Sequence, residues 1–153
     1  MQNNINIKNK KARFEYEILD KYTAGIVLSG TEIKSIRQSK ASISESFCEF
    51  NERGELFIIN MQIDEYSHAS HYNHQPKAAR KLLLNKRELK KLHKEVASSG
   101  LTIIPLNLFL NERGLAKMNI ALAKGKKLYD KRETMKDRDN KRDLDRIKKG
   151  FNR

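Results

Sequence analysis

The stretch SFCEFNERGELFIIN, residues 46–60, decides the fold, because it places two short apolar runs on either side of a turn. SFCEFN and ELFIIN are each predicted to be a strand, and the residues ERG between them form a compact turn in which Gly54 is available for a positive φ. Cys48 lies within the alternating run SFCEF, so we expect it to be a small buried hydrophobic residue. This stretch therefore predicts an antiparallel β-hairpin.

The letters NERG occur again at residues 111–114, between LTIIPLNLFL and AKMNIALA. The second occurrence predicts another hairpin with similar turn geometry, although the two hairpins are not a sequence repeat. Proline cannot donate a hydrogen bond within a sheet, so Pro105 is expected to mark an edge or a bulge.

Two further strands are predicted near the N-terminus, in FEYEIL (residues 14–19) and in the stretch ending at GIVL (25–28). A short helix follows, with Ser29 as its N-cap and Glu32 completing a capping box. With the hairpins, these segments amount to about six antiparallel strands.

The run KLLLNKRELKKLHKEVASSG, residues 81–100, predicts a second helix. Asn85 is the expected N-cap, with Glu88 as its capping-box partner. Leu84 and Leu89 can form a hydrophobic staple, and Gly100 stands where a C′ glycine belongs.

An antiparallel sheet of this size tends to close, so the predicted fold is mainly β: an OB-type barrel of about six strands with two or three flanking helices. We expect residues 1–12 to be a flexible basic arm, residues 13–127 to be the barrel domain and residues 128–153 to be a basic C-terminal tail.

The charge of the chain indicates a polyanionic partner. The 153 residues carry a formal net charge of +13 with a pI near 9.9, which favours nucleic acid. An anionic membrane surface is the second candidate, but it would require an amphipathic helix with a bulky apolar face. The N-terminal residues contain no apolar signal segment, so we expect a cytoplasmic protein.

No catalytic motif is visible: GxGxxG, P-loop, HExxH and GxSxG patterns are all missing from the sequence. The sequence therefore predicts no enzyme, no catalytic residue and no cofactor. His68, His71 and His74 could ligate zinc, but no carboxylate or thiolate stands at a convincing spacing. A surface loop that contacts water or RNA is the preferred interpretation.

Basic residues next to aromatic and small ones are the candidates for RNA contact, since cations bind phosphates and aromatic rings stack on unpaired bases. Phe14 and Tyr16 are equally well explained as strand residues on one face, with Tyr16 partly in the core. The basic candidates are Lys10, Arg13, Arg80, Lys81, Lys124, Lys126 and Lys127.

The tail poses a separate question. Residues 124–153 hold 13 Lys and Arg against 6 Asp and Glu, and so supply +7 of the net charge. Their few apolar residues are too sparse to fold alone, so a partner would have to order the segment. An inert solubilising tail is the alternative to a basic helix that fits an anionic groove.

Five stretches together resemble, in order, the motifs of the SsrA-binding proteins (small protein B). The stretches are NKKARFEY, AGIVLSGTEIKSIR, KASISESF, ARKLLLNKREL and AKGKKLYDKRE. The resemblance spans residues 9–133 and continues in character to the end of the chain.

The resemblance implies a monomeric, non-enzymatic OB-type protein that binds the tRNA-like domain of transfer-messenger RNA. It also implies delivery of that RNA, with GTP-bound elongation factor Tu, to stalled ribosomes for peptide tagging. The family's tail is disordered when free. On the ribosome it becomes a helix that contacts the decoding centre of 16S ribosomal RNA and the empty message channel.

Carried over by motif, Tyr16, Leu83, Asn85 and the lysines of AKGKK resemble the family's RNA-binding surface. In the tail, Tyr129, Asp130, Lys131 and Arg132 match the segment nearest the decoding centre, and Ile147 and Lys148 match the distal anchor. The chain departs from the family pattern at Thr23, which is acidic in some members, and at Phe14 and Tyr129, which are often histidine.

Three other functions fit parts of the sequence. A generic single-strand-binding OB protein would show several exposed aromatic residues along its strands. An RNA-modifying enzyme would need a cofactor loop or a carboxylate–histidine site. A ribosomal structural protein would bind ribosomal RNA without transfer-messenger RNA.

Overall fold

The computed structural model describes residues 5–69, 71–98 and 100–126. In chain order these residues form β1 (Asn6–Lys8), α1 (Ala12–Glu15), β2 (Tyr16–Ile26), α2 (Gly30–Arg37), β3 (Ala41–Ser42), β4 (Phe47–Phe50), β5 (Leu56–Ile59), β6 (Gln62–Ile63), β7 (Arg80–Leu83), α3 (Lys86–Ser98), β8 (Leu101–Leu110) and β9 (Ala116–Gly125).

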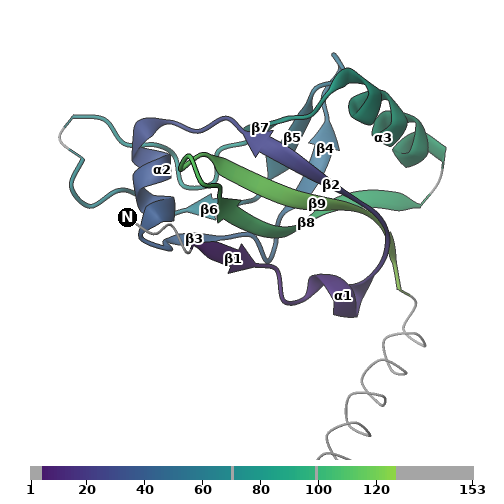
Figure 1. Cartoon of the computed structure of the whole chain (residues 1–153), viewed down its shortest axis with the longest axis horizontal. Coiled ribbons are helices and arrows are strands. Elements are labelled where there is room, and N and C mark those ends of the chain that lie inside the picture. Colours follow the sequence, from purple (N-terminus) through teal and green to yellow (C-terminus); the bar gives the residue numbers. More distant parts are fainter. Residues whose placement is uncertain (1–4, 70, 99, 127–153) are drawn as a thin grey trace, which may run out of the picture.

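The main sheet closes into a barrel. Its strands follow the order β1-β8-β4-β5-β7-β2-β9, and β9 also pairs with β8, so the six strands from β8 to β9 form a ring. Every pairing is antiparallel. Figure 1 shows α2 and α3 on opposite sides of this barrel. The prediction of a mainly β fold with about six antiparallel barrel strands is confirmed.

The two NERG turns share one geometry, as predicted. Gly54 and Gly114 both have φ of 77°, a value that L-residues with a Cβ adopt at a cost. In the first turn the Asn51 side-chain oxygen accepts hydrogen bonds from the backbone N–H groups of Arg53 and Glu55. Asn111 does the same in the second turn.

β2 is one strand of 11 residues, where two separate strands were predicted. The long strand β9 pairs with it from Tyr16 to Gly25 and so provides backbone partners for its polar middle. A register shift between Ile18 and Asp20 marks a bulge, and a second bulge follows Pro105 in β8, as expected for that proline.

The predicted flexible arm is partly ordered in the fold. Asn6–Lys8 pair with Leu108 and its neighbours in β8, because the edge of β8 offers free backbone groups there. Residues 12–15, where the first strand was predicted to begin, form the short helix α1 instead, anchored by Ala12 at 2% exposure.

Both capping boxes are confirmed. The Ser29 side chain accepts from the Glu32 backbone N–H, and the Glu32 carboxylate accepts from the Ser29 N–H. Asn85 and Glu88 exchange the same two bonds at the start of α3, at 2.9 and 3.3 Å. Gly100, just after α3, has a φ of 62°.

The barrel interior is apolar and buried. Ile58, Leu108, Met118 and Ile120 are all 0% exposed, and Leu92 of α3 joins the same cluster. Cys48 is buried as predicted, and burial raises the pKa of its thiol.

A buried polar cluster ties the loop after β6 to α2. The Arg80 guanidinium donates to the Glu32 carboxylate and to the backbone oxygens of Met61, Gln75 and Pro76. His74 Nε2 donates to the Ile63 carbonyl at 2.9 Å, and its Nδ1 lies 2.9 Å from the Thr31 hydroxyl. Both ring nitrogens of His74 are therefore occupied, whereas a solvent-facing loop residue was expected.

Candidate nucleic-acid interface

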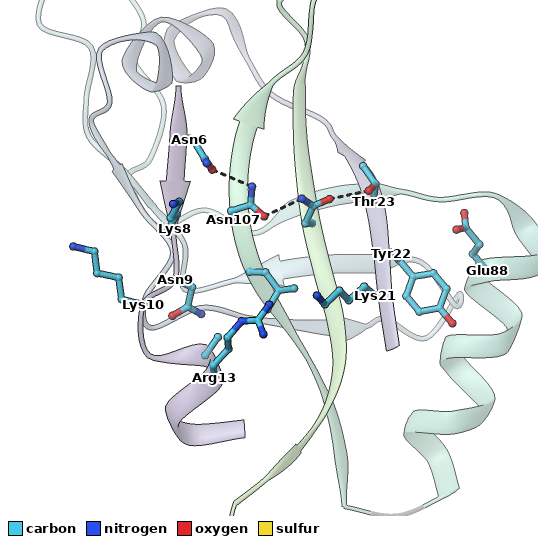
Figure 2. Close-up of a pocket in the computed structure, with 13 residues that line it drawn as sticks. Asn6, Lys8, Asn9, Lys10, Arg13, Lys21, Tyr22, Thr23, Glu88 and Asn107 are labelled. Atoms are coloured by element: carbon cyan, nitrogen blue, oxygen red, sulfur yellow. Dashed lines mark hydrogen bonds between the residues drawn. The ribbon is translucent and has the colours of Figure 1, made fainter. Parts of the chain in front are cut away.

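A groove of about 930 Å³ runs over the outer surface of the barrel beside the N-terminal segment. Figure 2 shows it crossing β1, β8, β9 and β2. Its lining residues are Asn6, Lys8, Asn9, Lys10, Ala12, Arg13, Lys21, Tyr22, Thr23, Glu88, Leu106, Asn107 and Asn119.

The floor of the groove is a row of hydrogen-bonded, uncharged side chains. Thr23 Oγ1 donates to Asn119 Oδ1 at 2.8 Å, and Asn119 Nδ2 donates to Asn107 Oδ1 at 2.9 Å. Asn107 Nδ2 then donates to Asn6 Oδ1 at 3.0 Å (Figure 2). Asn119 lies directly opposite Thr23 and Asn107 in the strand register, so the row is fixed by the sheet itself.

The cations of the groove come from the N-terminal segment and from β2, which also supply Asn6 and Thr23 to its floor. Lys8, Lys10 and Arg13 belong to the segment around α1, and Lys21 projects from β2. Asn9 holds the first segment on β8, because its backbone N–H and its amide donate to the carbonyls of Leu106 and Pro105. Four cations thus face one carboxylate, that of Glu88.

On the α3 side of the groove, the negative charge of Asp20 is paired with the positive charge of Lys91. The Tyr22 hydroxyl donates to Asp20 at 3.0 Å, and Lys91 lies 3.4 Å from the same carboxylate. The Tyr22 hydrogen bond, followed by the Lys21 backbone N–H, lowers the pKa of Asp20 below its usual value. Burial and then Asp20 raise the pKa of Tyr22. Asp20 therefore interacts with Tyr22 and Lys91, and among the described residues it forms no ion pair with a groove cation.

The structure brings together some of the residues that the sequence proposed for RNA contact. Lys10 and Arg13 both line the groove and are exposed. Lys126 lies against the far end of α1, where its Nζ donates to the Arg13 carbonyl at 3.0 Å. Lys124 is exposed beside it at the end of β9. Tyr16 is half-buried and packs on a small apolar cluster under α1.

Leu83 and Asn85 lie on the other side of β2. Leu83 is 51% exposed and pairs with Gly25 of β2. The two residues are close: a Cβ atom added to Gly25 would lie 3.4 Å from the Cβ atom of Leu83. Thr23 precedes Gly25 by two residues on the same strand face, so Leu83 continues the outer surface beyond the groove floor. Asn85 is exposed and acts as the cap of α3.

One of the proposed basic contacts, Arg80, is placed differently. Arg80 is 3% exposed and its donors are used by Glu32 and three carbonyls, so it stabilises the fold and does not reach the surface. This corrects its assignment as a phosphate contact. Lys81 is partly exposed and forms an ion pair with Glu55.

The remaining predicted contacts lie outside the described residues. They are Lys127, Tyr129, Asp130, Lys131, Arg132, Ile147 and Lys148.

The sequence reasoning did not assign Lys21, Thr23, Asn107 or Asn119 to the site. Asn107 and Asn119 interrupt the apolar runs LTIIPLNLFL and AKMNIALA, and a polar residue within a strand is a signal that could have located them. That they form one row depends on strand register, which the sequence does not give.

The groove can bind a polyanionic backbone through its cations and offer amide donors and acceptors between them. Within residues 5–69, 71–98 and 100–126 there is no group of His, Cys, Asp and Glu suited to hold a metal ion. None of the helices in those ranges is long and apolar enough to cross a membrane.

Comparison with known families matches residues 6–150 to the family described as SmpB protein. An SsrA-binding protein of Christiangramia forsetii is 70% identical over 151 residues, covering 99% of this chain and 96% of the relative. The SsrA-binding protein of Flavobacterium psychrophilum is 68% identical over 151 residues, covering 99% of this chain and all (100%) of the relative.

A solved structure described as "tmRNA-SmpB: a journey to the center of the bacterial ribosome" superposes with a TM-score of 0.68 at 47% identity. The match covers 81% of this chain and 86% of that one. A family match over nearly the whole sequence, relatives at this identity and a shared fold lead to one conclusion: this chain belongs to the SmpB protein family.

Proposed function

We propose that this protein binds the tRNA-like domain of transfer-messenger RNA and brings that RNA to stalled ribosomes for trans-translation. SsrA-binding relatives and a solved tmRNA–SmpB structure support the RNA and the ribosome as partners. The observation that carries the proposal is the groove, in which four cations surround a row of uncharged amides and one hydroxyl.

In this proposal each part of the surface has its own task. Lys8, Lys10, Arg13 and Lys21 bind phosphates and fix the orientation of the RNA. The amide row offers hydrogen bonds to ribose hydroxyls and base edges, and the exposed Leu83 packs on the RNA next to it. In this role the protein acts by supplying shape and charge to the RNA.

The proposal extends to the tail and to elongation factor Tu. Residues 128–153 enter the empty message channel, with Tyr129, Asp130, Lys131 and Arg132 near the decoding centre and Ile147 and Lys148 as the distal anchor. Elongation factor Tu joins the complex during delivery. The protein acts as a monomer in the cytoplasm.

Neutralising the groove tests the RNA-binding part. In Lys10→Gln/Arg13→Gln/Lys21→Gln we expect a loss of affinity for the tRNA-like domain of at least about tenfold, because three phosphate contacts disappear. The slope of log K against log salt should become shallower by about 2–3. Fluorescence anisotropy at two or more salt concentrations measures both quantities.

A matched control removes three charges elsewhere. Arg37→Gln/Lys40→Gln/Lys77→Gln changes exposed residues that do not line the groove. Equal losses in both triple variants would mean that only net charge matters. Equal affinity of the wild type for ordinary tRNA would favour the alternative of a generic basic RNA-binding protein.

Leu83 offers a test that does not involve charge. Leu83→Ala is expected to leave the unfolding temperature almost unchanged, since about half of the side chain is already exposed. It should weaken binding to the tRNA-like domain by about three- to tenfold if the exposed half of the side chain packs on RNA, because half of the burial free energy of a Leu is about 0.8–1.5 kcal/mol. Unchanged affinity would remove Leu83 from the interface.

A further inference from the structure

The outer face of α3 carries a lysine stripe, defined as Lys86, Lys90 and Lys94. Together with the tip of the β4–β5 hairpin it borders a second hollow of about 420 Å³. The lining residues of this hollow are Arg53, Gly54, Lys86, Leu89, Lys90, His93 and Lys94.

The stripe follows from the geometry of the helix. Residues four apart lie one above the other, about 6 Å along the axis at 1.5 Å per residue. Like charges at this spacing repel and destabilise a helix. The chain keeps three such lysines in one row, and a bound polyanion would relieve their repulsion.

No carboxylate lines the hollow. Other lysines nearby are compensated, since Lys81 pairs with Glu55 and Lys91 pairs with Asp20. No ion pair involves Lys86, Lys90, Lys94 or Arg53 within the part of the chain that the structure describes. The lining of the hollow therefore carries four cationic side chains and no carboxylate.

The two walls of the hollow are held in place. The His93 ring packs edge-on against Phe50 of β4, with ring centroids 4.8 Å apart, which fixes α3 on the hairpin. The other wall is the β4–β5 turn, in which Asn51 Oδ1 accepts a hydrogen bond from the Arg53 backbone N–H at 3.0 Å. The positive φ of Gly54 completes the turn. The cations are thus presented on a formed surface.

The lysine stripe faces away from the groove. Glu88 lines the groove and lies two residues from both Lys86 and Lys90, or about 200° around the helix at 3.6 residues per turn. Lys91, on the groove side of α3, reaches Asp20 of β2. An RNA bound in the groove would therefore leave the stripe free.

We propose that the lysine stripe and Arg53 bind the phosphate backbone of a ribosomal RNA helix while the groove holds transfer-messenger RNA. This inference rests on the proposed function, in which one copy must engage two RNAs at once. The lining supplies cations and few groups that could hydrogen-bond to base edges. Such a surface is suited to contact the phosphate backbone of RNA without reading its sequence.

The test uses the full-length chain with Lys86→Gln/Lys90→Gln/Lys94→Gln. Glutamine has nearly the helix propensity of lysine, so α3 should remain folded, and circular dichroism verifies this. We expect affinity for vacant ribosomes to fall at least about tenfold, with a salt slope shallower by about 2–3, because three phosphate contacts are lost. Affinity for the isolated tRNA-like domain should stay within about twofold of the wild type, since the groove cations are intact.

The control Arg37→Gln/Lys40→Gln/Lys77→Gln removes the same charge from another face and should preserve both affinities. An equal loss of ribosome affinity in the control would overturn the proposal, as would a stripe variant that weakens binding to the tRNA-like domain as much as to ribosomes. Failure of the wild type to bind the tRNA-like domain would instead refute the proposed function, so the two failures are distinguishable.

Discussion

Glu32→Gln is expected to destabilise the barrel by about 3–5 kcal/mol, because it leaves the Arg80 guanidinium charged and buried without its counter-ion. Arg80 is 3% exposed and Glu32 is 6% exposed, so water cannot replace the lost partner. The same carboxylate also completes the capping box of α2. Thermal and urea unfolding followed by circular dichroism would measure the loss, which corresponds to a fall in Tm of about 10 °C or more.

Glu55→Gln is the matched control. Its ion pair with Lys81 has the same 2.5 Å separation as the Glu32–Arg80 pair, but its side chains are 41% and 31% exposed. Exposed pairs contribute about 0–1 kcal/mol, so the control should lose little. If Glu32→Gln lowers the free energy of unfolding no more than Glu55→Gln does, burial does not determine how much the Glu32–Arg80 ion pair contributes to stability.

The effect has a definite pH dependence. Burial by itself raises the pKa of Glu32, but the Ser29 backbone N–H and the Arg80 guanidinium outweigh it and hold the pKa below its usual value. A group whose pKa is lowered by folding stabilises the protein above its unfolded pKa, about 4.3 for Glu. That stabilisation disappears as the pH falls through the folded pKa. The stability difference between wild type and Glu32→Gln should therefore narrow below about pH 4.3.

Local signals in the sequence predicted the elements better than their partners. The NERG turns, both capping boxes, the buried Cys48 and the bulge at Pro105 each depend on a few neighbouring residues, and all are confirmed. The continuity of β2 and the pairing of β1 depend on β9 and β8, which lie about a hundred positions away. Sequence periodicity contains no information on such partners.

The same limit explains the correction at Arg80. In the sequence, Arg80 stands next to Lys81 and so resembles one of a pair of surface cations. Its counter-ion Glu32 lies 48 positions earlier, where the local sequence does not reveal it. Lys10 and Arg13 were predicted from their basic segment, and they line the groove. Asn107 and Asn119 join them only because the β8–β9 register places them face to face.

A chain that ends at residue 127 is expected to retain RNA binding and to lose peptide tagging completely. The described barrel closes without the later residues: the β2–β9 ladder ends at Gly125, and the Lys126 backbone N–H donates to the Glu15 carbonyl. We therefore expect the unfolding temperature of the truncated chain to be almost unchanged. A large fall would mean that the tail packs on the barrel.

The loss of tagging follows from the division of tasks in the proposed function, since the groove lies on the barrel and the decoding-centre contacts are assigned to the tail. The double variant Asp130→Ala/Arg132→Ala sharpens the test, because it removes one charge of each sign and leaves the net charge of the chain at +13. In a reconstituted translation reaction on a message without a stop codon, both proteins should bind the tRNA-like domain normally and add no tag. Tagging by the truncated chain would show the tail to be dispensable, whereas lost RNA binding in the double variant would place part of the RNA interface beyond the barrel.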